Sequence, residues 1–286
     1  MKINTRILAA MFLASVPLAF AQTAPKPPKS MRLYVFDCGS IKGLSPAMFN
    51  FKPGEVKATE MVVPCYLVVH PNGTMIWDTG VIADSAFKPD GLPVTQGTGV
   101  IMGATKPLKT QLAAVGYKPS DITYLGLSHY HSDHTANAND FAGSTWLVHQ
   151  EERDFMFGPP QQGAIMATAS FSALKNAKTT IIKRDDYDVF GDGTAIIKFA
   201  PGHTPGHQVL FLKLAKTGPV LIAGDLYHYP EERTTGNVPT FEYNKEQSLA
   251  SRAKIEAFLK QSQAQLWIEH DKATFDTLKK APKYYE

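Results

Sequence analysis

The sequence has few cysteines and few charged residues, and both shortages restrict what it can be. Two of its 286 residues are cysteine, whereas nine are histidine. Two cysteines cannot build a disulfide framework or a zinc site made of thiolates. Charged residues make up 19% and hydrophobic residues 44% of the chain. That balance excludes disorder and coiled coil, and it gives one globular domain enough apolar material for a core.

The sequence also lacks an apolar run of the roughly 20 residues that a membrane span needs. The nearest candidate is Ile7–Phe20, which follows Lys2 and Arg6 and ends in an A-x-A site before Gln22. A basic start, a short apolar run and this site are typical of a secretory signal peptide. We expect residues 1–21 to be removed and the protein to be periplasmic or secreted, without membrane insertion. A transmembrane anchor is the alternative.

The rest of the chain is interpreted as a tether and one domain. Residues 22–30 are rich in proline and lysine and predict a tether, and residues 31–286 predict a single domain without internal repeats. Loss of residues 1–21 removes two cations and no anion, which lowers the formal charge from +3 to +1. Near-neutrality gives no electrostatic case for nucleic acid, so we expect a small-molecule substrate. The oligomeric state stays open, a homodimer included.

Short apolar runs separated by turn residues predict many strands with helices between them. Strands are expected at 32–38, 61–70, 74–77, 122–127, 145–148, 180–182, 195–199, 208–214, 220–223 and 265–268. Helices are expected at 108–115, 150–156, 164–174, 246–261 and 273–279. Pro64 predicts an edge position or a bulge in its strand. Segments 93–103 and 158–163 are expected to be irregular loops.

Four residues outside any motif carry weaker expectations. Cys38 and Cys65 lie in apolar strand-like runs, where buried free thiols are favoured, although a disulfide between them stays open in an exported protein. His70 and His149 have no partner in a motif and are expected at the surface.

Four ligand-type residues lie close together in the segment Ser128–His134, directly after a predicted strand. Residues two apart in an extended chain point to the same side, so His129 and His131 can face one metal ion. Asp133 and His134 follow where the chain turns and can face a second point. A polar surface loop is the alternative, but this many ligand-type side chains are costly to bury unless something binds them.

Three further ligand-type residues follow other predicted strands. His203 comes after the strand at 195–199, Asp225 after 220–223, and His270 after 265–268. Ligand-type residues therefore occur at the carboxyl ends of four strands, which counts further against a polar surface loop.

In order, these residues match the H-x-H-x-D-H motif, later His, bridging Asp and final His of the metallo-β-lactamase superfamily. All seven positions are filled, and the resemblance extends from about Arg32 to the C-terminus. It implies a four-layer αββα sandwich, with two β-sheets face to face and helices outside. Within the superfamily, the segments 64–67, 77–80, 201–214 and 269–271 resemble those of secreted N-acyl-homoserine lactonases.

The resemblance also implies a binuclear centre and a reaction. One metal ion would be held by His129, His131 and His203, and the other by Asp133, His134 and His270, with Asp225 bridging the two. Imidazole and carboxylate ligands suit two Zn²⁺ ions best, with Fe, Co or Mn as alternatives. A bridging hydroxide would then attack the carbonyl carbon of a lactone. A closed structural zinc site is the alternative, although such sites are more often rich in cysteine.

The clearest departure from the family pattern lies three residues after the bridging Asp225. Related lactonases commonly have a tyrosine there, and this sequence has His228. We expect His228, together with Asp133 and Asp225, to act in catalysis, with His228 as proton donor or substrate contact. Tyr227 or Tyr229 entering the site, or an exposed histidine, are the alternatives.

Several residues are expected to support the site. Asp78 can accept the second N–H of a metal-bound histidine, or it can simply form an Asp-Thr-Gly turn. An acyl-chain pocket is predicted from two apolar stretches, with core packing as the alternative. Its predicted lining residues are Phe155, Phe157, Ile165 and Met166, beside Tyr227 and Tyr229.

The primary hypothesis is an exported hydrolase that opens the ring of N-acyl-homoserine lactones and so quenches bacterial quorum signals. The main rival enzyme is a phosphotriesterase resembling methyl parathion hydrolase, because the same ligands can promote attack at phosphorus. A hydrolase of β-lactams or other esters is a further alternative. A metal-binding protein without hydrolytic activity is the rival from a different class.

Overall fold

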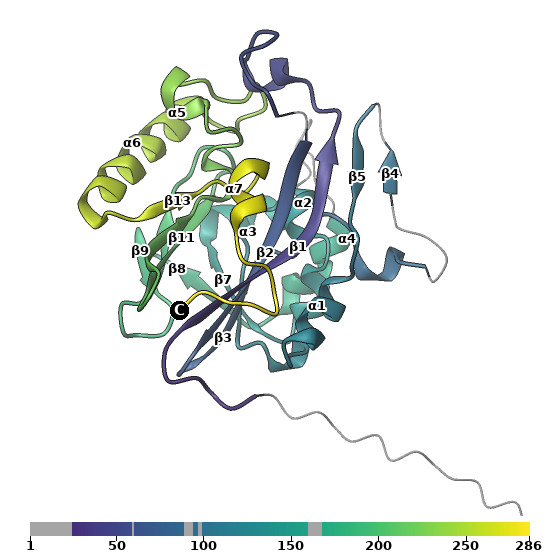
Figure 1. The fold of residues 1–286 in the computed structure, drawn as a ribbon, viewed down its shortest axis with the longest axis vertical. Helices are drawn as coiled ribbons and strands as arrows, with labels where there is room; N and C mark the ends of the chain where they lie inside the picture. The colour runs from purple at the N-terminus through teal and green to yellow at the C-terminus, as the bar shows by residue number, and fades with distance from the viewer. Residues whose placement is uncertain (1–24, 59, 89–93, 97–98, 160–167) are drawn as a thin grey trace, which may run out of the picture.

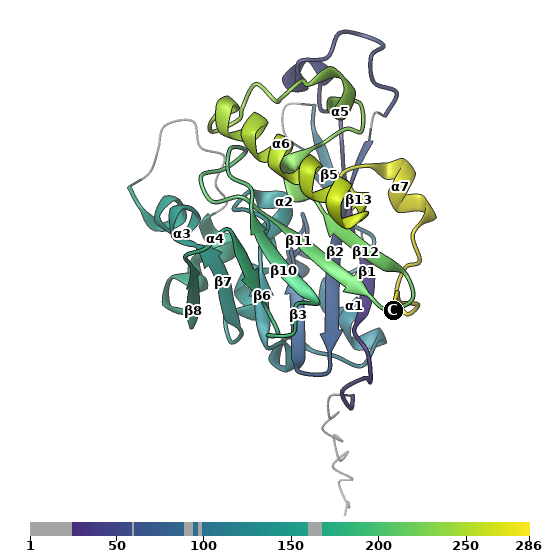
Figure 2. The ribbon, with the colours of Figure 1, turned by 90° about the vertical axis from the view of Figure 1, so that its left-hand side faces the viewer.

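Two β-sheets lie face to face and form the centre of the protein (Figures 1 and 2). The computed structural model describes residues 25–58, 60–88, 94–96, 99–159 and 168–286. The larger sheet has eight strands in the order β4-β5-β1-β2-β3-β6-β7-β8, and the smaller has five in the order β13-β12-β11-β10-β9.

Both sheets combine antiparallel and parallel pairs. Antiparallel pairs join β1, β2 and β3, whereas β3, β6, β7 and β8 run parallel. The larger sheet consists of β1 (Arg32–Lys42), β2 (Glu60–His70), β3 (Gly73–Trp77), β4 (Val94–Gln96), β5 (Ile101–Gly103), β6 (Tyr124–Gly126), β7 (Thr145–His149) and β8 (Thr179–Ile182). The smaller sheet consists of β9 (Asp186–Asp188), β10 (Ala195–Phe199), β11 (Gln208–Leu214), β12 (Gly218–Ile222) and β13 (Gln265–Trp267).

Helices cover the outer faces of both sheets, and Figure 2 shows α6 lying across the smaller one. The α-helices are α1 (Leu108–Ala114), α2 (Ser132–Thr135), α3 (Gln150–Phe157), α4 (Thr168–Phe171), α5 (Glu232–Thr235), α6 (Lys245–Ser262) and α7 (Lys272–Thr277). None of the described helices combines the length and the apolar character needed to cross a membrane.

Three hydrophobic clusters separate four layers. In β2, Leu67 faces outward and packs in one cluster with Leu112 of α1, whereas Val68 faces the smaller sheet and packs in a second. This alternation follows from the two-residue period of a strand. A third cluster joins the other face of the smaller sheet to Ile255 and Leu259 of α6. The order helix, sheet, sheet, helix confirms the predicted αββα sandwich.

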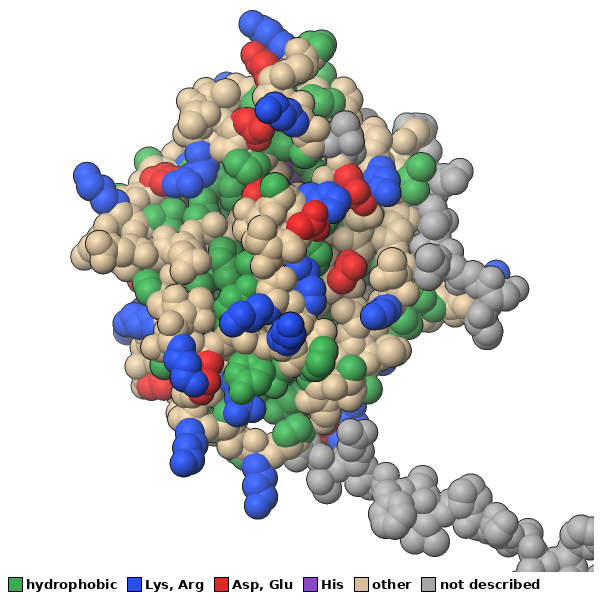
Figure 3. All heavy atoms as spheres, viewed as in Figure 1, with side chains coloured by type: hydrophobic (Ala, Val, Ile, Leu, Met, Phe, Trp, Pro, Cys, Tyr) green, Lys and Arg blue, Asp and Glu red, His purple; other side chains and the backbone are tan. Residues whose placement is uncertain are grey.

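The face of the molecule shown in Figure 3 carries charges of both signs, with more basic than acidic side chains over its lower half. On the upper half of the face in Figure 3, acidic and basic side chains alternate among hydrophobic and neutral ones. This distribution agrees with the small formal charge of the chain.

Most predicted elements are present, and several differences have a clear cause. Strands β10 and β11 begin and end at the predicted residues. The prediction of an irregular loop at 93–103 was wrong, because β4 and β5 form there and β5 pairs with β1. Pro64 lies opposite a bulge of β1, between Asp37 and Ser40. Of the helix expected at 164–174, residues 164–167 lie outside the described residues, and the rest forms α4 and the start of a 3-10 helix, Ser172–Asn176. Of the loop expected at 158–163, residues 160–163 lie outside the described residues.

Two histidines predicted at the surface are buried. His70 stacks on Phe190, with its Nε2 atom 2.8 Å from Asp192 Oδ2. His149, at the end of β7, stacks on Phe199 of the other sheet. The prediction of a surface position was wrong for both histidines, because the residues that they contact lie more than 45 residues away in the sequence.

Cys38 and Cys65 form a disulfide, so the expectation of free thiols was wrong. The two residues lie on the paired strands β1 and β2, where Phe36 is directly opposite Cys65. The bulge after Asp37 shifts the register, and the Cα atoms of the two cysteines lie 5.8 Å apart. That separation lies within the range that a disulfide requires. The sequence alone does not reveal this register.

Candidate metal centre and active site

The seven ligand-type residues meet at one edge of the two sheets. His129, His131, Asp133 and His134 follow β6 of the larger sheet, while His203, Asp225 and His270 follow β10, β12 and β13 of the smaller one. The carboxyl ends of these strands thus bring together residues from both sheets. The site is built where the two sheets face each other.

One group of side chains surrounds a first point. His131 Nδ1 lies 2.9 Å from His129 Nε2 and 3.0 Å from His203 Nε2. Asp225 Oδ2 lies 3.2 Å from His203 Nε2 and 3.5 Å from His129 Nε2. One ligand atom from each of these four residues lies within 4.8 Å of the others.

A second group lies on the other side of Asp225. Its Oδ1 atom is 3.2 Å from His134 Nε2 and 3.0 Å from His270 Nε2. Asp133 Oδ2 completes the group at 3.7 Å and 3.6 Å from the same two nitrogen atoms. The two oxygens of Asp225 therefore face different groups, which is the arrangement of a carboxylate shared by two metal ions.

The donor atoms fit two divalent cations. His134 Nε2 and Asp225 Oδ1 are buried and have no hydrogen-bond partner among the described residues. Burial lowers the pKa of His129 and of His131 well below the usual value, so both rings are neutral and can offer a lone pair. Burial raises the pKa of Asp225, but the surrounding histidines, His270 foremost, hold it well below its usual range. The neutral rings of His129 and His131, beside the carboxylate of Asp225, are ligands suited to zinc and similar ions.

Outer hydrogen bonds turn the Nε2 atoms of three histidines toward the centre. His134 Nδ1 lies 2.9 Å from Asp78 Oδ2, and His203 Nδ1 lies 2.8 Å from Glu242 Oε1. His270 Nδ1 donates to the carbonyl oxygen of Val62 at 2.8 Å. Such contacts fix the tautomer and orientation of a metal-binding histidine.

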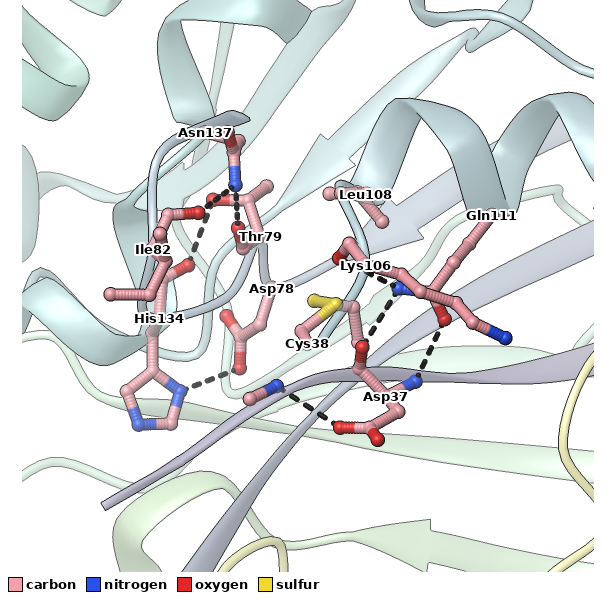
Figure 4. The surroundings of a disulfide bond; sticks show 12 residues. Asp37, Cys38, Asp78, Thr79, Ile82, Lys106, Leu108, Gln111, His134 and Asn137 are labelled. Atoms are coloured by element: carbon pink, nitrogen blue, oxygen red, sulfur yellow. Dashed lines mark hydrogen bonds and ion pairs between the residues drawn. A yellow bond between two sulfur atoms is a disulfide. The ribbon is translucent and has the colours of Figure 1, made fainter. Parts of the chain in front are cut away.

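Asp78 lies beside His134, one of the ligand-type histidines. The other carboxylate oxygen of Asp78 accepts from the backbone N–H of Ser128 at 2.6 Å. Its backbone is left-handed, with φ of 56°. Figure 4 shows Asp78 beside Cys38, with its carboxylate directed at His134. The disulfide thus lies next to the loop that orients one of the histidines.

Asp225 is positioned by a glycine that no other residue can replace without strain. Gly224 has φ of 51°, and an added Cβ atom would lie 2.7 Å from His207 Nε2. His207 Nε2 in turn accepts the backbone N–H of Asp225 at 3.0 Å. A side chain at position 224 would therefore displace the shared carboxylate.

His228 also faces the centre, but from outside the two ligand groups. Its Nε2 atom lies 3.0 Å from Asp225 Oδ2, and its ring lies nearly parallel to that of His270. Burial lowers its pKa, opposed by Asp225. The ring is placed to exchange a proton with a molecule bound beside Asp225.

A small cavity of about 110 Å³ opens over the centre. Apolar side chains line it together with His131, Asp133, Asp225, His228 and His270. The apolar residues are Ile41, Leu44, Met48, Phe49, Met61, Met102 and Phe241. The cavity can hold a polar group against the centre and an apolar group against the methionine and phenylalanine side chains.

The four predicted pocket residues that the structure describes do not line this cavity. Tyr227 donates to Glu256 Oε1 at 3.1 Å, with its ring beneath Arg252 of α6. Tyr229 packs edge-on against Phe49 and lies behind the lining. The chain turns after Asp225, so these tyrosines point away while His228 points in.

The two predicted phenylalanines belong to the core under α3. Phe155 stacks on Tyr130, and Phe157 packs edge-on against Trp146 and Phe171. Core packing, the alternative interpretation, therefore describes them correctly. Ile165 and Met166 lie outside the described residues.

Sequence reasoning missed several buried charged residues around the centre. Glu242 and Glu269 approach His203 and His134, and Glu232 forms an ion pair with Arg252 beneath His228. Glu152 accepts hydrogen bonds from Tyr130 N, Thr204 Oγ1 and Gly206 N, and so ties two ligand-bearing loops together. Of these glutamates, Glu152, Glu232 and Glu242 have no motif around them. Only Glu269, directly before His270, could have been suspected from its position.

Comparison with known proteins agrees with this geometry. Residues 58–259 match the family model described as the metallo-beta-lactamase superfamily. The chain belongs to this superfamily. Among curated members, the N-acyl homoserine lactonase AttM of Azorhizobium caulinodans is 30% identical over 263 residues, covering 90% of this chain and 99% of that protein. An N-acyl homoserine lactonase from a Bacillus species is 30% identical over 229 residues, covering 77% and 84%.

Solved structures of superfamily members have the same fold. An N-acyl homoserine lactone hydrolase with the product N-hexanoyl-L-homoserine at its catalytic metal centre superposes with a TM-score of 0.74 at 25% identity. The match covers 88% of this chain and 98% of that one. The dizinc lactonase AidC, at 18% identity and a TM-score of 0.64, shows the shared fold alone. In the present chain, the two His and Asp clusters described above fit a dinuclear metal site.

Proposed function

We propose that this protein is an exported metal-dependent lactonase that opens the ring of N-acyl-homoserine lactones. The observation that carries the proposal is the cavity, whose lining combines apolar side chains, Met48 and Phe49 among them, with the carboxylate of Asp225. An N-acyl-homoserine lactone has the matching division into a polar ring and an apolar chain. The near full-length similarity to AttM supports the same substrate class.

In this proposal the seven residues hold two divalent ions, most suitably Zn²⁺. His129, His131 and His203 hold one, Asp133, His134 and His270 hold the other, and Asp225 contributes one oxygen to each. When bound, such a pair of ions supplies Lewis acidity that polarises a carbonyl group and makes water more acidic.

The remaining steps belong to side chains of this chain. Asp133 is partly exposed in the cavity lining, so its carboxylate can accept a proton from the attacking water. His228 Nε2 faces the same space and can donate a proton to the ring oxygen as the bond between that oxygen and the carbonyl carbon breaks. The apolar side chains of the cavity lining hold the acyl chain and exclude water from it.

Export is supported by two features of the chain. The first residues have the pattern of a cleavable signal peptide. The Cys38–Cys65 disulfide suits an oxidising compartment such as the periplasm or the extracellular space.

The test compares substrates on the metal-loaded protein. Acyl-homoserine lactones of several chain lengths, a paraoxon-like phosphotriester and a β-lactam are offered at equal concentrations, and kcat/KM is measured for each. We expect the lactones to have the highest value, by at least about 100-fold. Much faster triester turnover would identify a phosphotriesterase and overturn the proposal. Tight metal binding without hydrolysis of any substrate would identify a metal-binding protein instead.

A further inference from the structure

A buried ion pair lies directly beneath His228. Glu232, the first residue of α5, is 1% exposed, and Arg252 of α6 is 5% exposed. Glu232 Oε2 accepts from Arg252 Nη2 at 2.7 Å and from the backbone N–H of His228 at 3.1 Å. Because buried charges are costly to keep, such a pair raises the question of what it does there.

The pair is attached to the backbone that carries the site. Arg252 Nε donates to the carbonyl oxygen of Leu226 at 2.8 Å, one residue after Asp225. Its guanidinium group lies 4.6 Å from the ring centroid of Tyr227. Arg252 and Glu232 together therefore hold the segment from Leu226 to His228 at both ends. The carboxylate of Glu232 is fixed relative to the histidine ring.

Two atoms between these residues have no partner. Glu232 Oε1 and His228 Nδ1 are both buried without a hydrogen bond among the described residues, and they lie 3.8 Å apart. An unpaired buried polar atom costs about 1–3 kcal/mol. A single proton between the two atoms would satisfy both at once. Hydrogen bonds of this kind are often long without substrate and shorten in the substrate complex.

We propose that Glu232 is a positioning residue that pairs with His228 Nδ1 and so directs His228 Nε2 to donate its proton to the leaving oxygen of the lactone. This inference rests on the proposed lactonase function. The role of His228 as donor was expected from the sequence, whereas its support by Glu232 and Arg252 comes from the structure.

The step is balanced in protons. As the bond between the ring oxygen and the carbonyl carbon breaks, the oxygen takes the proton from His228 Nε2 and becomes the hydroxyl group of the product. The proton between Nδ1 and Glu232 Oε1 stays on the ring, which leaves the step as a neutral imidazole. The proton released when the new carboxyl group ionises restores Nε2.

The test uses two substrates that differ in one atom. In the lactone the leaving group is an alkoxide, which needs a proton, whereas in the matching thiolactone it is a thiolate, which leaves without one. For Glu232→Gln we expect kcat on the lactone to fall about 10- to 100-fold, with little change in KM. Turnover of the thiolactone should stay within about threefold. His228→Gln should show the same selective loss.

The matched control is Glu256→Gln. Glu256 also forms an ion pair between α5 and α6, with Arg233, but it is partly exposed and does not contact His228. We expect both substrates to be turned over as by the unaltered protein. Equal losses of turnover on lactone and thiolactone in Glu232→Gln would indicate a purely structural role and overturn the inference. Unchanged turnover of the lactone in Glu232→Gln would overturn it as well.

A second variant and a second measurement guard against misfolding. Glu232→Asp keeps a charge for Arg252 but withdraws the carboxylate from Nδ1, so it should show the same selective loss with an unchanged unfolding temperature. In ¹⁵N NMR of the zinc-loaded protein, the Nδ1 resonance of His228 should shift in Glu232→Gln and stay in Glu256→Gln. If the unaltered protein opens neither ring, the lactonase proposal fails, whereas a resonance unaffected by Glu232→Gln contradicts the pairing itself.

Discussion

At the scale of single residues, the site depends on side chains that touch no substrate. The ring nitrogen of His203 that faces the cluster is oriented by a buried carboxylate, Glu242, on its other nitrogen. Burial lowers the pKa of His203, but Glu242 and Asp225 together raise it to about 10. Holding His203 in place thus relies on a residue that no motif includes.

We expect Glu242→Gln to weaken metal binding about 10- to 100-fold, since removal of an outer carboxylate typically has this effect. The measurement is the metal content after dialysis against graded chelator concentrations. Glu246→Gln is the matched control, because Glu246 is exposed in the first turn of α6. Equal metal retention in both variants would show that Glu242 does not support the site.

The protonation of His149 should reduce the stability of the protein in acid. Burial lowers the pKa of His149 to about 4, whereas in the unfolded chain it lies near 6.5. The unfolded state therefore takes up the proton first, and the contribution of neutral His149 to stability is lost as the pH falls from about 6.5 to about 4. His149→Phe keeps the contact with Phe199 and removes the proton site. Denaturant unfolding at pH 7 and pH 4.5 should show a smaller loss of stability for the variant than for the unaltered protein, and an equal loss would contradict the assignment.

At the scale of elements, the sequence predicts the site better than its surroundings. The ligand residues follow strands whose apolar runs are local signals, and β10 and β11 were predicted to the residue. Where a residue's surroundings depend on distant pairing, prediction failed. Strand β5 forms because it pairs with β1, and the disulfide forms because a bulge shifts Cys38 toward Cys65.

The sequence also does not predict in which direction side chains point after a turn. Tyr227 and Tyr229 flank His228, yet only the histidine enters the site. The turn at Gly224 and the contacts of Arg252 set this direction, and both depend on residues from other parts of the fold. The lining residues Met48, Phe49 and Phe241 likewise come from segments that carry no motif.

The Cys38–Cys65 disulfide should stabilise the folded protein. It joins β1 and β2 across a sequence separation of 27 residues. Replacing both cysteines by alanine should lower the free energy of unfolding by about 3 kcal/mol, because the unfolded chain gains freedom. Urea unfolding with and without a reducing agent measures this loss. The reductant should weaken the unaltered protein and leave the double variant unchanged, and equal stability of the two proteins without reductant would contradict a stabilising role.

At the scale of the whole molecule, the candidate metal centre joins the two halves of the sandwich. The larger sheet contributes His129, His131, Asp133 and His134, and the smaller contributes His203, Asp225 and His270. Bound ions would therefore hold the sheets together as well as support the reaction. The rate of lactone hydrolysis should therefore rise in proportion to the amount of metal bound.

The most direct measurement is a titration of metal-free protein with Zn²⁺ while hydrolysis of an N-acyl-homoserine lactone is followed. We expect little activity without metal and a rise that ends at two equivalents of Zn²⁺ per chain. Asp225→Ala should fold but gain no activity at any zinc concentration. Activity that is complete at one equivalent, or lactone hydrolysis that needs no metal, would contradict a two-metal active site.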